Sequence, residues 1–388
     1  TERAGGAASE RACRGARGAQ PPPPPPPPPH EADVQQEFTM SAMYEKLAMP
    51  ASGLRLHLNE NTGGCSKAVL EALRGITSED AALYPDYTEA TAALAGRLGV
   101  PGSHVLLTNG LDEGIFAAAL TTLRGGAPAE PFEAIVIAPG FDMFPGSSRR
   151  AGGRVVPVPL EADFAFPLEG VLAAITERTR IVFVTTPHNP TGLTVPRDAI
   201  LRIAQENRGL LVFVDEAYID FGGDTLVDTR VLDAHPNLVV GRTLSKAYGL
   251  AAIRAGALVA TPDTLGPLRD SVPPYSINIA AVRAIPAALQ DTAHHSWYLA
   301  EVRESKRLMY AALERLGIQY WPSDANFVFA RFGDRAPEVT AGLHARGIYV
   351  RDRSSDPACA GCVRITTGVV AHTQACLAAI EEVLCGAR

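Results

Sequence analysis

No apolar run in the 388-residue sequence reaches the roughly 18 to 20 residues that a membrane-spanning helix needs, and the N-terminus has no hydrophobic signal core. Basic residues are not in excess either, because 35 Lys and Arg stand against 42 Asp and Glu, for a formal net charge of -7. This balance argues against a nucleic-acid-binding protein, which would need a concentrated basic face. We therefore predict a cytoplasmic protein with no membrane or nucleic-acid partner.

Cysteine is also scarce, and six residues are too few for a disulfide framework at this length. They are Cys13, Cys65, Cys359, Cys362, Cys376 and Cys385. The Cys359–Cys362 spacing, with His372 and Cys376 downstream, is that of the first half of a zinc site. No matching second pair follows, and the same region must also form a strand and a helix. We expect a loop with free thiols and no metal site.

The first 39 residues differ from the rest of the chain. They are rich in Ala, Gly and Arg and contain the uninterrupted prolines Pro21 to Pro29, a run that favours an extended polyproline helix of about 3.1 Å per residue. We predict a disordered tail over residues 1–39. Two interpretations stay open: a ligand for an SH3-type domain, or sequence upstream of a natural start at Met40 or Met43.

Hydrophobic residues make up 46% of the chain and charged residues 20%, which is enough for a large buried core. From Tyr84 onward, helical patterns alternate with short apolar runs, as is typical of a mainly parallel sheet covered by helices on both faces. The expected strands are 134–138, 181–185, 210–214, 237–241 and 255–260. Helices are expected at 168–175 and 197–206, the second starting after Pro196.

After residue 286 the pattern changes to that of a smaller α+β unit. We expect a helix at 296–316, strands at 325–331, 347–351 and 362–366, and a closing helix at 373–384. The predicted organisation is an N-terminal arm with part of the small domain at 40–79, a large cofactor-binding domain at 80–290 and a small C-terminal domain at 291–388.

The most informative residue is Lys246, in the stretch Arg-Thr-Leu-Ser-Lys-Ala-Tyr-Gly-Leu. It is preceded, in order, by Asn189-Pro190-Thr191-Gly192 and by Asp215-Glu216-Ala217-Tyr218. A lysine amine forms a Schiff base with pyridoxal phosphate, and that cofactor also needs an acid at its ring nitrogen and polar groups at its ring oxygen and phosphate. The ordered set resembles the class I/II aminotransferases, which implies an α/β protein of fold type I. Each motif follows an expected strand, where open α/β sheets place their ligands.

The resemblance implies a role for each of these residues. Lys246 would carry pyridoxal 5'-phosphate, and Asp215 would hold the proton of its ring nitrogen. Tyr218 and Asn189 would bind its ring oxygen and together lower the pKa of the Schiff base. Lys246, Asp215 and Tyr218 are thus the expected catalytic residues. For Asp215, a plain turn or helix cap is the alternative interpretation.

The cofactor phosphate is expected at the start of the helix that opens with Leu111. The backbone amides of Leu111 and Asp112 would meet it, because a helix N-terminus favours anions. The Asp112 side chain should then point away. By resemblance, Thr243, Ser245 and Arg254 would complete the phosphate site, for which a planar, permanently charged guanidinium is suited.

Phe141 follows another strand and resembles the aromatic residue that stacks on the cofactor ring, although a core phenylalanine is the competing interpretation. Four further segments resemble the histidinol-phosphate aminotransferase subfamily: 58–61, 84–86, 347–351 and 363–366. The resemblance covers roughly residues 55 to 385. Within that group Tyr84 would reach the cofactor phosphate of the partner subunit, which implies a homodimer.

The substrate residues implied by this resemblance are Asn59, Tyr84, Asn189, Arg351 and Arg364. Arg364 would bind the carboxylate of glutamate and the anionic end of the other substrate, with Arg351 assisting at a phosphate. The alternative interpretation is that both arginines are ordinary surface residues that form ion pairs. The sequence departs from the family at Thr62, where a proline is usual, and at residues 250–254, which read Leu-Ala-Ala-Ile-Arg instead of Leu-Ala-Gly-Leu-Arg.

The implied activity is pyridoxal-phosphate-dependent transamination of histidinol phosphate with 2-oxoglutarate as acceptor, in histidine biosynthesis. An aromatic-amino-acid transaminase and a phosphothreonine decarboxylase share the same cofactor residues, so the amino donor stays open. A different class is a non-catalytic effector-binding domain of a transcription regulator, which would need a winged-helix domain upstream.

Overall fold

The computed structural model describes residues 49–386, which belong to one compact unit. The tail predicted over residues 1–39 lies outside the described residues. The domain borders expected at 79/80 and 290/291 stay predictions. Among the described residues, none of the helices combines the length and apolar character that crossing a membrane requires.

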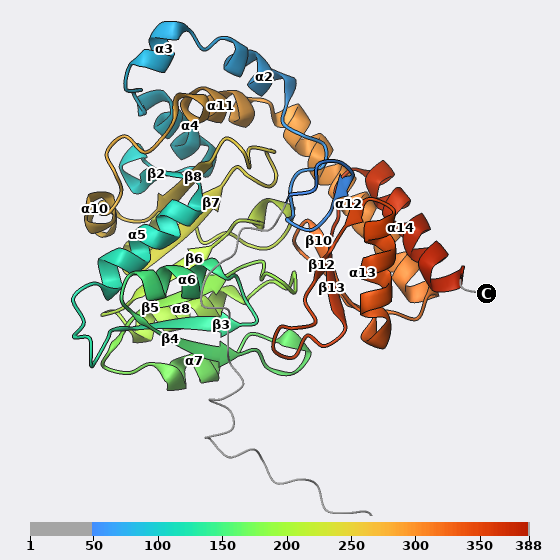
Figure 1. The fold of residues 1–388 in the computed structure, drawn as a ribbon. Coiled ribbons are helices and arrows are strands. Elements are labelled where there is room, and N and C mark those ends of the chain that lie inside the picture. The colour runs from blue at the N-terminus through green and yellow to red at the C-terminus, as the bar shows by residue number, and fades with distance from the viewer. Residues whose placement is uncertain (1–48, 387–388) are drawn as a thin grey trace, which may run out of the picture. The chain divides into compact units, whose positions relative to one another are not determined.

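The centre of the fold is a seven-stranded sheet of order β2-β8-β7-β6-β5-β3-β4 (Figure 1). All neighbouring strands are parallel except at β8, which runs antiparallel to both β2 and β7. The mainly parallel α/β sheet expected from the sequence is thus confirmed. The strands are β2 (Val105–Asn109), β3 (Glu133–Ala138), β4 (Arg154–Pro159), β5 (Thr179–Thr185), β6 (Leu211–Asp215), β7 (Leu238–Thr243) and β8 (Ala255–Val259).

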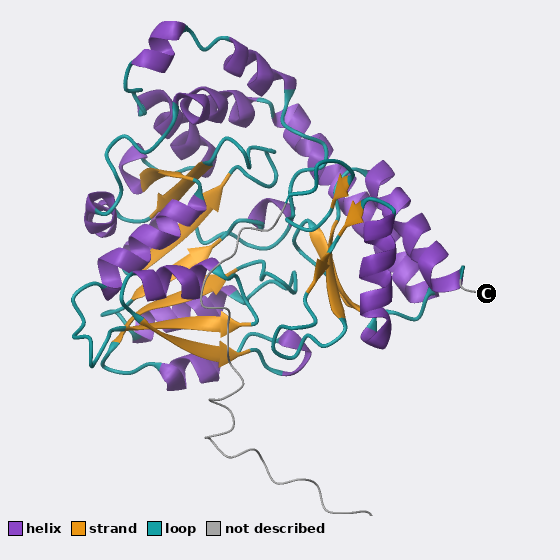
Figure 2. Ribbon diagram, in the orientation of Figure 1, coloured by secondary structure: helices purple, strands orange, loops and turns teal. Residues whose placement is uncertain are grey.

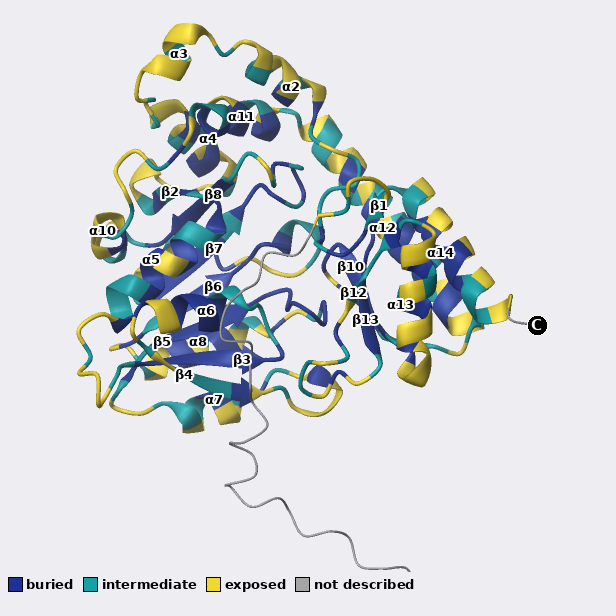
Figure 3. Cartoon of the chain, in the orientation of Figure 1, coloured by how far each residue is buried: buried dark blue, intermediate teal, exposed yellow. Residues whose placement is uncertain are grey.

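Successive residues of the central strands pack into two different cores, which buries both faces of the sheet (Figure 3). On β5, for example, Val182 and Val184 belong to one cluster, whereas Ile181 and Phe183 belong to the other. The first core is completed by helices that include α4 (Thr88–Leu98), α8 (Arg197–Glu206) and α11 (Ile279–Gln290); the second by α5 (Leu111–Leu123), α6 (Met143–Arg150) and α10 (Pro262–Asp270). This two-sided burial explains why the strands read as continuous apolar runs.

The two edge strands, β2 and β4, were not among the strands expected from the sequence. An edge strand has a neighbour on one side only, so its sequence is less uniformly apolar. β4 is only partly buried and carries Pro157 and Pro159, residues that a sheet tolerates mainly at its edge. The other elements of this part are α2 (Lys67–Arg74), α3 (Ser78–Ala82), α7 (Leu168–Ala174) and α9 (Thr229–Ala234), with 3-10 turns at Gly102–His104, Ala162–Phe164 and Ile219–Phe221.

A second, antiparallel sheet has the order β12-β13-β10-β9 and forms a separate group of strands in Figure 2. Its strands are β9 (Gln319–Trp321), β10 (Phe327–Arg331), β12 (Arg351–Asp352) and β13 (Cys362–Thr366). Helices α12 (Thr292–Arg315), α13 (Ala336–Ala345) and α14 (Val370–Cys385) pack with it, and a 3-10 turn spans Gly333–Arg335. The expected smaller α+β unit is therefore present.

The single strand expected at 347–351 is two short strands. β11 (Ile348–Tyr349) pairs in parallel with β1 (Leu54–Arg55), whereas β12 pairs with β13, so the chain changes partner at Val350. This pairing ties the segment before Asn59 to the smaller unit. Cys359 and Cys362 are free and buried against aromatic residues, and Cys362 is the first residue of β13.

Candidate active site

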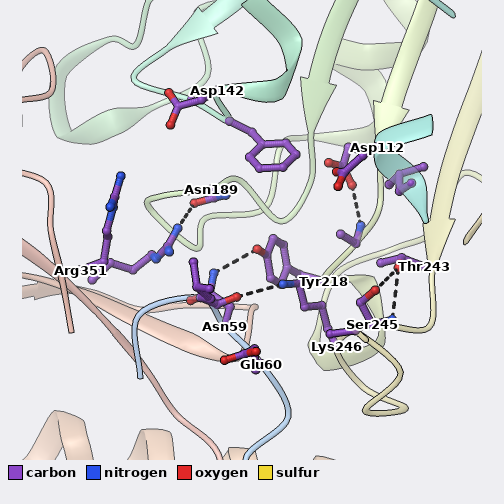
Figure 4. Close-up of a pocket in the computed structure, with 18 of the residues that line it drawn as sticks. Asn59, Glu60, Asp112, Asp142, Asn189, Tyr218, Thr243, Ser245, Lys246 and Arg351 are labelled. Atoms are coloured by element: carbon purple, nitrogen blue, oxygen red, sulfur yellow. Dashed lines mark hydrogen bonds between the residues drawn. The ribbon is translucent and has the colours of Figure 1, made fainter. Parts of the chain in front are cut away.

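A cavity of about 560 Å³ lies where the carboxyl ends of β6 and β7 meet β12, β13 and the segment after β1. It is lined by every predicted site residue except Tyr84: Asn59, Leu111, Asp112, Phe141, Asn189, Asp215, Tyr218, Thr243, Ser245, Lys246, Arg254, Arg351 and Arg364. Figure 4 shows Thr243 and Ser245 on one side, Arg351 on the other, and Tyr218 with Lys246 between them. Residues far apart in the sequence are thus brought to one cavity.

Lys246 lies three residues beyond the end of β7, with its amine inside the cavity. The Nζ atom donates to the backbone oxygen of Leu58 at 3.0 Å. Burial lowers the pKa of Lys246 to about 8, and the positive charge of Arg364 acts in the same direction. The neutral form of this amine, which a nucleophile or a proton acceptor needs, is therefore far more accessible near physiological pH than that of an ordinary lysine.

Asp215 is the last residue of β6, as the apolar run before it predicts. Its Oδ1 accepts from the Ala217 backbone N–H at 2.9 Å, so the turn-capping role that the sequence left open is present. Burial nevertheless raises the pKa of Asp215 to about 7. The ionised form of a carboxyl group whose pKa is raised by burial is stabilised by a cation or a proton donor beside it. The protonated ring nitrogen of the expected cofactor would supply one.

Tyr218 and Asn189 both line the cavity, and each is hydrogen-bonded by another side chain. The Tyr218 hydroxyl accepts from Asn59 Nδ2 at 3.0 Å, and burial raises the pKa of Tyr218. Asn189 Oδ1 accepts from Arg364 Nη1, which leaves the Asn189 amide hydrogens for another partner. Asn59, which was expected to contact the substrate, is 1% exposed, and its side-chain amide donates to Tyr218.

The other end of the cavity is built around the start of α5. Gly110 caps this helix without a side chain, so the first backbone amides of α5 face the cavity without a capping partner. Gly110 has φ of 75°, and a Cβ at this position would lie 2.2 Å from Arg254 Nη2. Only glycine lets the guanidinium pass so close to the helix start. Thr243 Oγ1 and Ser245 Oγ, 2.9 Å apart, complete this end.

The expectation that the Asp112 side chain points away from this end is wrong. Its carboxylate lines the cavity and accepts from Arg254 Nη2 at 2.9 Å. Two attractions hold it there, because an acidic residue in the first turn of a helix is stabilised by the helix dipole and the guanidinium adds a direct ion pair. Both groups are partly exposed to solvent, so the ion pair is weak.

The end of the cavity at β12 and β13 carries three arginines. Arg351 on β12 lies directly opposite Arg364 on β13, and like charges in this register repel. Arg364 is buried, donates to the His57 backbone oxygen at 2.7 Å, and has its pKa lowered to about 10 mainly by burial. Arg351 has no hydrogen bond or ion pair with any described residue. A pair of guanidinium groups without a carboxylate between them is an anion site.

Sequence reasoning missed the third arginine, Arg353, as well as Glu60 and Asp142 on the cavity wall. Arg353 is buried, forms an ion pair with Asp356 and donates to the backbone oxygen of Gly140 at 3.3 Å. Its spacing of two from Arg351 was the available signal, because residues two apart on a strand share a face.

Two predicted residues keep more than one interpretation. Phe141 lines the cavity but also packs edge-on against Phe144, with ring centroids 5.7 Å apart. Tyr84 is the one site residue that the structure does not bring to the cavity. It is 78% exposed and stacks on Tyr275, with ring centroids 4.2 Å apart. The prediction that it serves a partner subunit stays a prediction.

The comparisons with known proteins agree on one family. Residues 51–380 match the family profile described as aminotransferase class I and II. The chain is 32% identical to the histidinol-phosphate aminotransferase of Cytophaga hutchinsonii over 326 residues, 83% of this chain and 89% of that protein. It is 37% identical to that of Symbiobacterium thermophilum over 307 residues, 77% of this chain and 81% of that protein.

Solved structures agree with the fold. The crystal structure of histidinol-phosphate aminotransferase from Sinorhizobium meliloti in complex with pyridoxal-5'-phosphate has a TM-score of 0.78 and 27% identity, covering 86% of this chain and 92% of that chain. A putative histidinol-phosphate aminotransferase from Erwinia carotovora atroseptica gives a TM-score of 0.76 and 26% identity, covering 85% of this chain and 95% of that chain. The expected fold type I architecture is therefore confirmed.

Proposed function

This chain belongs to the class I and II aminotransferases, and we propose that it uses pyridoxal 5'-phosphate to transfer the amino group of histidinol phosphate to 2-oxoglutarate. The observation that carries the proposal is the composition of one cavity. It has a buried lysine of lowered pKa in its middle, a helix N-terminus with hydroxyl groups at one end and, at the other, two arginines that form no ion pair with a described carboxylate.

The residues of the cavity fit the cofactor. The amides of Leu111 and Asp112, with Thr243, Ser245 and Arg254, would hold its phosphate. Asp215 would hold the proton of the ring nitrogen, which its raised pKa favours. Phe141 would cover one face of the ring. When bound, the cofactor supplies an electron sink for the negative charge that forms at the substrate Cα.

The protein's own part in the reaction is to hold and move protons. Lys246 would take the proton from the substrate Cα and give it back at the cofactor, which requires a neutral amine. Burial and the Arg364 charge favour that neutral form by lowering the pKa of Lys246. Tyr218 and Asn189 orient the ring from one side. Since the keto product leaves before the second substrate binds, while the amino group would stay with the cofactor until 2-oxoglutarate takes it, the kinetics should be ping-pong.

The phosphate of the substrate is assigned to Arg351 and Arg364. A phosphate that carries nearly two negative charges gains from both guanidinium groups and removes the repulsion between them, whereas a single carboxylate needs only one. The same site must then accept glutamate and 2-oxoglutarate in the other half-reaction. Arg364, which is also bonded to Asn189, would serve both substrates.

The assembly would be a homodimer. Tyr84, Leu83 and Tyr275 are exposed large apolar residues, and Tyr84 and Tyr275 stack on each other outside the cavity. Exposed aromatic groups of this kind favour burial against a partner, and a second copy of the chain would bring Tyr84 to the cofactor phosphate end of the neighbouring cavity.

A panel of amino donors tests the substrate. Purified protein should have its highest kcat/KM with 2-oxoglutarate when histidinol phosphate is the donor. A preference for phenylalanine would replace the proposal with an aromatic-amino-acid transaminase, and release of carbon dioxide from phosphothreonine would replace it with a decarboxylase. Failure to bind pyridoxal phosphate would leave the non-catalytic effector-binding alternative.

A further inference from the structure

Asn59 has a hydrogen-bond partner on each of its polar groups, although it lies in a loop. Its Nδ2 donates to the Tyr218 hydroxyl at 3.0 Å, and its backbone oxygen accepts from Asn326 Nδ2 at 3.1 Å. Its backbone N–H donates to Thr366 Oγ1 at 3.1 Å, and its Oδ1 accepts from the same hydroxyl at 3.2 Å. The backbone has φ of 55°, a left-handed value that asparagine tolerates better than most residues. Contacts at the ends of β10 and β13 thus hold this side chain in one place.

The Thr366 hydroxyl decides which way the Asn59 amide faces. A backbone N–H can only donate, so Thr366 Oγ1 accepts that bond and still has one proton to give. Among the residues that the structure describes, Asn59 Oδ1 is its acceptor. Were the amide turned round, its NH2 group would face Thr366 and the hydroxyl proton would have no acceptor at a fully buried site, which is unfavourable.

Tyr218 then has one hydrogen-bonding direction left. Its oxygen accepts from Asn59 Nδ2, so its proton is free to be donated into the cavity. We infer that Thr366 is a positioning residue, which acts through Asn59 to make Tyr218 a hydrogen-bond donor to an anionic oxygen bound beside Lys246. The inference rests on the proposed function, in which that oxygen is the ring oxygen of pyridoxal phosphate.

This arrangement has a measurable effect on the cofactor. A donor at the ring oxygen stabilises its negative charge and so weakens its hold on the proton of the lysine–cofactor linkage, which lowers the pKa of that linkage. In Thr366→Val the shape is kept but the hydroxyl is lost. The Asn59 amide can then turn its oxygen to Tyr218 and take the Tyr218 proton. The pKa of the linkage should rise by about one unit, equivalent to about 1.4 kcal/mol.

The test is a pH titration of the absorbance of the bound cofactor in the holoenzyme. Thr366→Val should show the raised pKa, and Thr366→Ser, which keeps the hydroxyl, should restore the wild-type value. Thr367→Val is the matched control, because Thr367 is the buried neighbour whose hydroxyl has no hydrogen-bond partner among the described residues. An unchanged pKa in Thr366→Val, or an equal shift in Thr367→Val, would overturn the inference.

The path through Tyr218 is tested in a Tyr218→Phe background, where Thr366→Val should add no further shift; an additive shift would overturn it. If Thr366→Val does not fold, Asn59→Asp reads the same step, because a carboxylate can only accept and takes the Tyr218 proton. Its titration should also move upward, and an unmoved pKa would refute the inference. A wild-type protein that forms no absorbing linkage with pyridoxal phosphate would instead refute the proposed function, and the inference with it.

Discussion

Replacing Arg351 by alanine should weaken turnover of histidinol phosphate without weakening the fold. Arg351 has no hydrogen bond or ion pair with any described residue and lies directly opposite Arg364. Its removal therefore breaks no hydrogen bond or ion pair among the described residues and relieves a cross-strand repulsion of roughly 0.2 to 1 kcal/mol. The melting temperature should stay unchanged or rise by at most about 2 °C in a protein of this size.

The catalytic effect has the opposite sign. One charge-assisted hydrogen bond to a phosphate contributes roughly 1.5 to 3 kcal/mol, and about 1.4 kcal/mol corresponds to a factor of ten. We expect kcat/KM for histidinol phosphate to fall about ten- to a hundredfold in Arg351→Ala. The half-reaction with glutamate should change much less, because Arg364 suffices for a carboxylate.

The assay compares the two half-reactions by stopped-flow absorbance, with melting followed in parallel. Arg346→Ala is the matched control, since Arg346 is an exposed arginine paired with Glu382 and does not line the cavity. Equal damage to both half-reactions would refute the assignment of Arg351 to the phosphate. So would a loss of turnover that is accompanied by a lowered melting temperature.

Four further results are expected. Borohydride reduction of the yellow holoenzyme should fix the cofactor to Lys246, and a label on another residue in the peptide map would contradict the central assignment. Asp215→Ala should fold but lose several orders of magnitude in turnover, because an unprotonated ring is a poorer electron sink. In the apo protein, Asp215 itself should cost stability to urea as pH rises from about 4 to about 7, since its folded pKa is about 7 against the ordinary 3.8 and the folded state holds a proton that the unfolded state has released. The free energy of unfolding of Asp215→Ala minus that of the wild type should therefore increase over this range. Mixed inactive Tyr84→Phe and Lys246→Ala proteins should regain some activity through hybrid sites in a dimer that buries well over about 2,000 Å², whereas a fully active monomer in sedimentation would exclude this arrangement.

The proposed cofactor end of the site was predictable because its residues follow continuous apolar strands. Asp215 ends β6 and Thr243 ends β7, so the position of each side chain follows from where the strand stops. The same rule failed at the sheet edges, where β4 is only partly buried and contains two prolines. The local sequence pattern thus predicts the inner strands of a sheet that is buried on both faces, but it does not predict the edge strands.

The substrate end was predictable only in part, because burial there comes from tertiary contacts. Arg353 looks like a solvent-exposed arginine in the sequence, but it is buried by contact with Gly140, 213 residues away. Asn59 was expected at the substrate and does line the cavity, but its Nδ2 donates to Tyr218 and its Oδ1 accepts from Thr366, 307 residues away. No local signal in the sequence reports contacts of this separation, so a residue's neighbours can be predicted less well than its secondary structure.

Counter-charges are distributed differently at the two ends of the cavity. One end is proposed for the cofactor, which stays bound, and the other for the substrates, which exchange in every cycle. Arg254, at the proposed phosphate end of the cofactor, shares its guanidinium with Asp112, and such a carboxylate competes with any anion for the same donor. Backbone amides at the start of α5 and the hydroxyls of Thr243 and Ser245 add donors there, so that competition can be tolerated for a ligand held by many bonds. At the opposite end Arg351 has no internal competitor among the described residues. Substrates that bind and leave in every cycle rely on few contacts. A guanidinium pair without an ion-pair partner among the described residues would concentrate their binding energy on the anionic end, so we expect net anionic charge to be the feature by which this protein selects its amino donor.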